Sequence, residues 1–379
     1  MLQILLNQQK TEVRQKPATK KILILGTSNS LFKGGWVAGL SHALQGYQIK
    51  NMSVGASQGF QFAGIVSQEN FSQYDYVFFD SLANEESYCL GRQADKYHYT
   101  DQVERLLYEL MSTIASQTNL IVMGFCKHYA FDKESEIFQS RRRLTQNVGG
   151  YFFDIRKMLK LHMMTHSLTI QDIYDETQHP KREISYEIGR RLGSVLESIS
   201  LDKYKYAKDY SGNFSRQKIS LKDKTKEYKN SVMSLGVSRI SKEDSIGLNN
   251  HLRCIGFYLN AIKTNCYVEC SYQGKSVQEI GLLYTVYNEQ AENFQKIFVG
   301  LQDFPVIDTL RIIGSDTDFQ NLYFPLITHK QKLPSLDALE LSEVLYWDDK
   351  NALDPYPNDI FSYDESMLLT YKVINSIIG

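Results

Sequence analysis

The first half of the chain alternates short apolar runs with longer amphipathic stretches. Two of the longer stretches, 101–116 and 183–199, repeat apolar side chains every three to four residues, which predicts helices. Four short runs between polar residues predict mainly buried strands, at 21–25, 47–54, 75–80 and 119–124. Because helices separate these strands, the pattern predicts a parallel sheet that helices cover on both faces.

Beyond residue 230 the apolar spacing changes towards two, the period of a strand. Six segments follow this pattern between turn signals: 231–240, 252–261, 264–273, 277–286, 295–301 and 308–314. They predict a β-rich, sandwich-like domain. The chain therefore divides into an N-terminal lead at 1–20, an α/β domain at 21–202, a lysine-rich linker or edge at 203–230, and a β-rich domain at 231–379 that ends in a helix at 365–378.

Composition and charge exclude several classes of function. The 379 residues carry a formal net charge of −1, which disfavours binding through phosphate contacts. No apolar run approaches the roughly 20 residues of a membrane span, and residues 1–6 lack the flank and cleavage site of a signal peptide. The five cysteines do not form a disulfide pattern. We therefore expect a cytoplasmic protein with no nucleic-acid partner and no membrane span.

Candidate chemistry begins at the end of the first predicted strand. That strand stops at Gly26 and is followed by Ser28, an arrangement that displays a nucleophile at the carboxyl edge of an α/β sheet. The same residues also fit a turn and a helix N-cap. Three partners further along the chain, Gly55, Asn84 and His179, favour the nucleophile.

Four blocks in chain order carry a family resemblance. They are residues 26–28 (Gly-Thr-Ser), 51–57 (Asn-Met-Ser-Val-Gly-Ala-Ser), 80–85 (Asp-Ser-Leu-Ala-Asn-Glu) and 174–180 (Tyr-Asp-Glu-Thr-Gln-His-Pro). In order and spacing they resemble the SGNH (GDSL-type) hydrolases, specifically the carbohydrate O-acetyltransferase and esterase branch, over about residues 20–200. The resemblance implies a three-layer, flavodoxin-like domain with a parallel sheet.

The resemblance also implies catalytic roles. A serine hydroxyl needs a base to take its proton, and His179 is the candidate base for Ser28. Attack on an ester carbonyl leaves negative charge on its oxygen. The backbone N–H groups of Ser28 and Gly55 and the side-chain amide of Asn84 would receive that charge as an oxyanion hole. Glycine suits this role because a missing Cβ lets the backbone approach a substrate.

The acid that would orient His179 departs from the family pattern. The family places Asp three residues before its His, and here that position is Glu176, with Asp175 one residue earlier. The spacing favours Glu176 as the acid, and Asp175 is the alternative. The third interpretation is that the reaction does not need an acid beside His179. Thr27 replaces the usual Asp before the serine, and Leu82 replaces the Gly two residues before Asn84.

The reaction that follows is acyl-ester chemistry on a carbohydrate. The resemblance favours an O-acetyltransferase that modifies a bacterial surface polysaccharide of capsular or lipopolysaccharide type, with acetyl-CoA as acyl donor and no tightly bound cofactor. A carbohydrate or acetyl esterase is the alternative, and a non-catalytic glycan-binding or assembly protein is the competing class. The β-rich domain would then bind carbohydrate. The oligomeric state stays open.

Other polar clusters are explained without function. His162 and His166 lie four apart on a predicted helix but lack a third metal ligand. Among His251, Cys254, Cys266 and Cys270, strand alternation favours apolar packing over zinc. We therefore expect no metal. Residues 141–143, three consecutive arginines, fit a solvated helix face better than contact with a phosphate or a charged donor.

Overall fold

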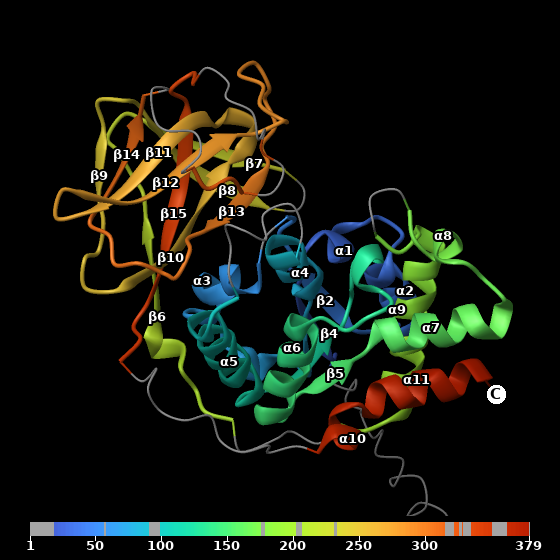
Figure 1. The fold of residues 1–379 in the computed structure, drawn as a ribbon. Coiled ribbons are helices and arrows are strands. Elements are labelled where there is room, and N and C mark those ends of the chain that lie inside the picture. The colour runs from blue at the N-terminus through green and yellow to red at the C-terminus, as the bar shows by residue number, and fades with distance from the viewer. Residues whose placement is uncertain are drawn as a thin grey trace, which may run out of the picture.

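The protein has an α/β part and a β-rich part, which lie against each other in a computed structural model (Figure 1). The described residues are 19–56, 58–90, 99–175, 179–201, 207–230, 233–314, 322–325, 328, 335–350 and 362–378. None of the helices in these segments combines the length and the hydropathy of a membrane-spanning helix.

The α/β part is built on a five-stranded sheet in the order β2-β1-β3-β4-β5. Every neighbouring pair is parallel. The residues of the inner strands β3 and β4 are buried throughout, which is why they appear as unbroken apolar runs in the sequence. The strands are β1 (Lys21–Leu25), β2 (Gln48–Asn51), β3 (Tyr76–Phe79), β4 (Asn119–Met123) and β5 (Tyr151–Phe153).

Helices cover both faces of this sheet, because the strand order reverses next to β1 and sends the crossovers to opposite sides. On one side α2 packs closely on α9: a Cβ at Gly39 would lie 1.9 Å from the Tyr186 carbonyl oxygen, so only glycine permits the crossing. The helices of this part are α1 (Ser28–Leu31), α2 (Trp36–Ala43), α3 (Ala63–Val66), α4 (Leu82–Leu90), α5 (Asp101–Ala115), α6 (Glu136–Asn147), α7 (Ile155–His166), α8 (Ile170–Ile173) and α9 (Arg182–Ser198), with 3₁₀ turns η1 (Gly59–Phe62), η2 (Phe71–Gln73) and η3 (His128–Ala130).

The β-rich part consists of two antiparallel sheets. One has six strands, in the order β13-β10-β15-β8-β7 with β6 also pairing to β15, and the other has four, β12-β11-β14-β9. Most of their buried apolar side chains belong to a core cluster that continues into the α/β part, and two smaller clusters lie around Tyr267 and around Tyr228. The elements are η4 (Ser211–Asn213), β6 (Phe214–Lys218), β7 (Thr225–Lys229), β8 (Ser234–Ile240), β9 (Ser245–Gly247), β10 (Arg253–Asn260), η5 (Ala261–Lys263), β11 (Asn265–Tyr272), β12 (Lys275–Leu283), β13 (Lys296–Gly300), β14 (Thr309–Ile313) and β15 (Leu339–Trp347).

Buried hydrogen bonds join the two parts. The carboxylate of Glu109, on α5, accepts from the Trp347 indole at 2.9 Å and from the Asn213 side chain at 3.0 Å. It also pairs with Arg105 one helical turn away at 2.8 Å, so the buried charge is compensated. A second bond between the two parts joins β10 to η1, where the Tyr258 hydroxyl donates to the Gln61 carbonyl at 2.8 Å. These bonds fix how the β-rich part lies over η1 and α5.

The fold class agrees with the sequence prediction, and the structure adds three features of the second half. Residues 203–230, predicted as a lysine-rich linker or edge, contain β6 and β7, and β7 lies at one edge of the six-stranded sheet. The predicted closing helix, α11 (Leu368–Ile378), which follows α10 (Tyr363–Ser366), contacts α7, α9 and β5 and so packs on the α/β part. Strand β15 was not predicted, although it pairs with both β10 and β8.

Candidate active site

The predicted site residues gather at the carboxyl edge of the parallel sheet. Ser28 is the first residue of α1, three residues beyond the end of β1. Gly55 follows β2, and Asn84 lies in the first turn of α4, which follows β3. The order of the strands reverses beside β1, and ligands of open α/β sheets bind outside the carboxyl ends of the strands at such a reversal. Topology alone therefore brings these three segments together.

Ser28 and His179 are in direct contact although 151 positions separate them. Ser28 Oγ lies 2.9 Å from His179 Nε2, within the reach needed for direct proton transfer. The imidazole and the Phe32 ring pack at nearly a right angle, with a centroid distance of 4.8 Å. Both partners are half-buried. The arrangement can take a proton from a hydroxyl that remains within reach of a substrate.

Hydrogen bonds hold the residues on both sides of His179 together and join them to the residues that follow β4. Tyr174 and Pro180 form an isolated β-bridge, and the Lys181 amide donates to the Ile173 carbonyl at 2.8 Å. The buried Tyr174 hydroxyl donates to the carbonyl of Cys126, just beyond β4, at 3.2 Å. Backbone and side-chain bonds together thus hold the imidazole over the end of β1.

The two candidate acids differ in what can be said of them. Glu176 lies outside the described residues, so its predicted role stays a prediction. Asp175 is exposed, and its Oδ1 accepts from the His179 backbone amide at 3.1 Å. Its own amide donates to the His179 carbonyl at 2.9 Å. Asp175 therefore shapes the turn that presents the histidine.

The predicted oxyanion donors occupy different environments. Asn84 is 3 % exposed and lies on α4. Gly55 is half-buried, and a Cβ built on it would lie 3.7 Å from the Leu31 side chain, which is ordinary contact. Packing therefore does not demand glycine at position 55, and the predicted reason, close approach of a substrate to the backbone, stays a prediction.

A buried network beneath the nucleophile escaped the sequence analysis. The Trp36 indole donates to Ser30 Oγ at 3.2 Å, and Ser30 Oγ donates to Asp80 Oδ2 at 2.6 Å. The Asn51 amide donates to the Ser30 carbonyl at 2.8 Å. Burial raises the pKa of Asp80 to about 6, against the opposing hydrogen bond from Ser30. The network ties the turn after β1 to the ends of β2 and β3. Its one sequence signal is a polar pair, Ser30 and Asp80, beside apolar runs.

The raised pKa of Asp80 makes stability depend on pH. The folded state holds the proton up to about pH 6, whereas the unfolded chain releases it near pH 4. The free energy of unfolding should therefore fall as pH rises from about 4 to 6, by up to ~3 kcal/mol from this group. Asp80→Asn should remove that part of the slope in urea unfolding at pH 4, 5, 6 and 7. Asp101→Asn, an exposed carboxyl, is the control, and equal slopes in all three proteins would contradict the assignment.

A buried ion pair lies beside Asn84. Arg141 Nη2 is 3.2 Å from Glu85 Oε1, and both side chains are fully buried. The same Glu85 oxygen accepts from the Gly59 amide at 2.7 Å, and Arg141 Nη1 donates to Ser81 Oγ at 2.9 Å. The prediction of a solvated arginine face is therefore wrong for Arg141. Helical spacing cannot reveal that a neighbouring helix covers one of three consecutive arginines.

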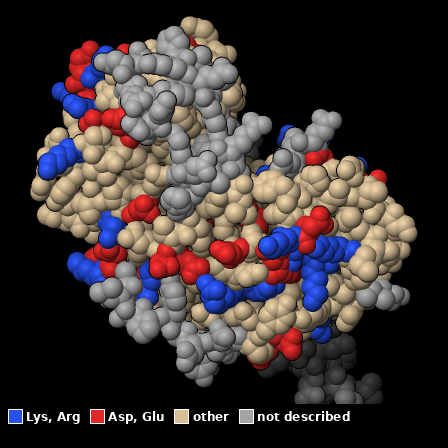
Figure 2. All heavy atoms as spheres, in the orientation of Figure 1, with Lys and Arg blue, Asp and Glu red and all other residues tan. Residues whose placement is uncertain are grey.

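The other two arginines form ion pairs nearer the surface, and of the two only Arg143 is exposed, since the Arg142 side chain is partly buried. Arg143 is exposed and pairs with Glu104 at 3.0 Å, and Arg142 pairs with Glu134 at 2.7 Å. On the face shown in Figure 2, basic and acidic side chains lie next to one another across the α/β part. Such alternation screens each charge locally and leaves no broad field of one sign on that face.

The residues considered for metal binding have other surroundings. Cys254, Cys266 and Cys270 are buried and unbonded, and burial raises the pKa of the Cys270 thiol to about 12. The rings of His162 and His166 lie tilted against each other at a centroid distance of 4.4 Å. Among the described residues, no cluster of three or more His, Cys, Asp or Glu side chains could hold a metal ion.

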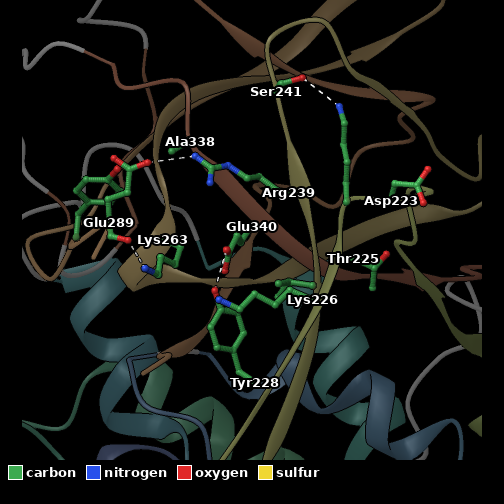
Figure 3. A pocket seen from close by; sticks show the side chains of 13 residues that line it. Asp223, Thr225, Lys226, Tyr228, Arg239, Ser241, Lys263, Glu289, Ala338 and Glu340 are labelled. Atoms are coloured by element: carbon green, nitrogen blue, oxygen red, sulfur yellow. Dashed lines mark hydrogen bonds and ion pairs between the residues drawn. The ribbon is translucent and has the colours of Figure 1, made fainter. Parts of the chain in front are cut away.

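A hollow of about 470 Å³ lies in the β-rich part (Figure 3). At its floor the buried Tyr228 hydroxyl donates to Glu340 at 2.9 Å, and the Lys226 ammonium lies 4.4 Å from the centre of the Tyr228 ring. Arg239 reaches across to Glu289 at 3.3 Å. Cations and carboxylates are thus largely balanced around an aromatic ring.

Comparison with solved structures identifies the fold. A two-domain esterase active on acetylated mannans, in a crystal with mannopentaose, aligns with a TM-score of 0.56 at 8 % identity, covering 87 % of this chain and 91 % of that one. The same esterase crystallised without mannopentaose aligns with a TM-score of 0.55 and the same identity and coverage. At this identity the likeness shows the two-domain fold alone. No family model and no curated protein matches the sequence.

Proposed function

We propose that this chain is a serine-dependent carbohydrate esterase that removes acetyl groups from sugar hydroxyls. The observation that carries the proposal is the 2.9 Å contact between Ser28 Oγ and His179 Nε2 at the carboxyl edge of the sheet. It is supported by a two-domain fold like that of an esterase active on acetylated mannans.

The mechanism follows from the chemistry of the two groups. His179 takes the hydroxyl proton as Ser28 Oγ bonds to the ester carbonyl carbon, and the carbonyl oxygen gains the charge. Donors expected at Gly55 and Asn84 would stabilise that oxyanion. Its collapse breaks the bond to the sugar oxygen, which receives the proton from His179. Water then attacks the acyl carbon while His179 takes the water proton. The bond between that carbon and Ser28 Oγ breaks, Oγ regains its proton from His179, and acetate leaves.

The O-acetyltransferase favoured by the sequence differs only in the second step. There a sugar hydroxyl replaces water, and acetyl-CoA loads Ser28. The described residues favour neither acceptor, so transfer to a bacterial surface polysaccharide stays a prediction. So does glycan binding by the β-rich part, for which the hollow around Tyr228 offers an aromatic ring and balanced polar groups.

The experiment compares three reactions of the purified protein. We expect acetate release from O-acetylated manno-oligosaccharides, followed by NMR, and labelling of Ser28 by a fluorophosphonate, located by mass spectrometry. Acetyl-CoA with deacetylated oligosaccharide tests transfer, since acetyl on the sugar would favour the transferase. If there is neither labelling nor turnover of any ester, the enzyme proposal fails and the non-catalytic glycan-binding class takes its place.

A further inference from the structure

A second hollow, of about 320 Å³, lies between the two parts of the protein. One wall consists of residues 51–54, at the end of β2 and beyond it, with Gly64 and Ile65. The opposite wall carries Arg216, Tyr258, Lys296 and Glu343, from adjacent strands of the six-stranded sheet. We call this hollow the interdomain cleft.

The interdomain cleft holds more positive than negative charge. Glu343 is buried and pairs with both Arg216, at 3.2 Å, and Lys296, at 3.5 Å. Lys50, at the rim, has its own partner in Glu69 at 3.0 Å. One carboxylate therefore serves two cations within the cleft, which leaves about one positive charge uncompensated.

That excess charge sits in a place where water stabilises it poorly. Burial lowers the pKa of Lys296, although Glu343 opposes the shift. The ammonium lies 3.9 Å from the centre of the Tyr258 ring, and the hydroxyl of that tyrosine is fixed by its bond to the Gln61 carbonyl. Lys296 shares its one carboxylate partner, Glu343, with Arg216. A second anion would therefore stabilise the ammonium, and the attraction would be strong because little water screens the charge in the cleft.

The cleft adjoins the candidate active site. Asn51 lines it and also donates to the Ser30 carbonyl, two residues from Ser28. Val54 lines it too, directly before Gly55. A ligand in the cleft would thus contact the segment that leads to the predicted oxyanion donor.

We propose that the interdomain cleft binds an anionic group of the substrate, a carboxylate or a phosphate, between Arg216 and Lys296. Two sources supply this chemistry: a hexuronate residue of an acylated glycan, or the phosphates of an acyl donor such as acetyl-CoA. The nature of the substrate rests on the proposed function, whereas anion binding itself does not.

The test measures binding in Ser28→Ala protein, by calorimetry, so that turnover does not interfere. The probes are partly O-acetylated hexagalacturonate, partly O-acetylated mannohexaose as the neutral match, and acetyl-CoA. We expect one anionic probe to bind at least about tenfold more tightly than the neutral one, as a charged hydrogen bond would give. Lys296→Met should abolish this advantage. Lys275→Met, which removes an exposed lysine of β12, should not change it.

Lys296→Met could lose binding simply because the protein misfolds, so a second variant, Glu343→Gln, tests for a gain of binding. It frees both cations and should tighten the anionic probe severalfold, a gain that damaged protein cannot show. Tight binding of hexagalacturonate would identify a hexuronate of the glycan as the ligand of the cleft, and tight binding of acetyl-CoA would identify the phosphates of the acyl donor. Equal binding of all three probes, or no response to Lys296→Met and Glu343→Gln, overturns the proposal. If the anion binds as expected but no ester is turned over, the proposed function fails and the anion site stands.

Discussion

Replacing Ser28 with alanine is expected to lower kcat/KM for an O-acetylated oligosaccharide by about 10⁴-fold or more. The hydroxyl within 2.9 Å of His179 Nε2 is the atom that would form the acyl intermediate, so its loss removes the covalent route altogether. Acetate release, measured at substrate concentrations well below KM, gives the ratio directly.

The matched control is Ser30→Ala, two residues along the same turn. The Ser30 hydroxyl donates to buried Asp80, so this variant should lose stability and yet keep most of its turnover per folded molecule. A Ser28→Ala enzyme that retains more than about a tenth of wild-type kcat/KM, or a Ser30→Ala enzyme as inactive as Ser28→Ala, would move the nucleophile elsewhere.

Two further variants separate the expected roles at this site. His179→Ala combined with Ser28→Ala should be no worse than either alone, because groups that act as one unit give non-additive losses. Asn84→Ala should cost about 10²- to 10³-fold, the usual effect of one oxyanion donor. A smaller loss would leave Asn84 as a buried residue of α4 with a packing role.

Much of the fold could be predicted from the sequence because its signals are local. The runs at 21–25, 75–80 and 119–124 became β1, β3 and β4, since buried parallel strands must be apolar along their whole length. Strand β15 escaped because its sequence mixes apolar residues with Glu340 and Glu343, which are buried although they are charged. Partners on other strands, such as Tyr228 for Glu340 and Arg216 for Glu343, compensate these carboxylates, and no local pattern shows them. Only its neighbours β10 and β8 identify it as a central strand.

Part of the candidate site could likewise be predicted from local signals, and part could not. Ser28, Gly55 and Asn84 follow predicted strands of one parallel sheet, so topology alone gathers them. The contact of Ser28 with His179 depends on a turn that tertiary bonds to Cys126 hold in place. In the network around Asp80 the bonded residues are 50 positions apart in the sequence, and in the ion pair of Arg141 they are 56 positions apart. No pattern within a single helix or strand predicts such contacts.

Replacing Arg141 should destabilise the fold strongly. Arg141→Met leaves Glu85 buried at 0 % exposure without its cation, and breaking a buried pair on one side costs about 3–5 kcal/mol. The neighbouring Arg143→Met is the control: it removes a half-exposed partner of Glu104 and should cost less than about 1 kcal/mol. Urea unfolding of both variants at one pH measures the difference.

A second substitution shows whether the lost charge or the lost packing is responsible. Glu85→Gln added to Arg141→Met removes the stranded carboxylate and keeps an oxygen for the Gly59 amide, so about half of the lost stability should return. Because Glu85 follows Asn84 and also holds the start of η1, the single variant should lose turnover before it unfolds, and the double variant should regain it. Equal stability of Arg141→Met and Arg143→Met would mean that Glu85 finds another partner or a proton, and the pair would not position this edge of the site.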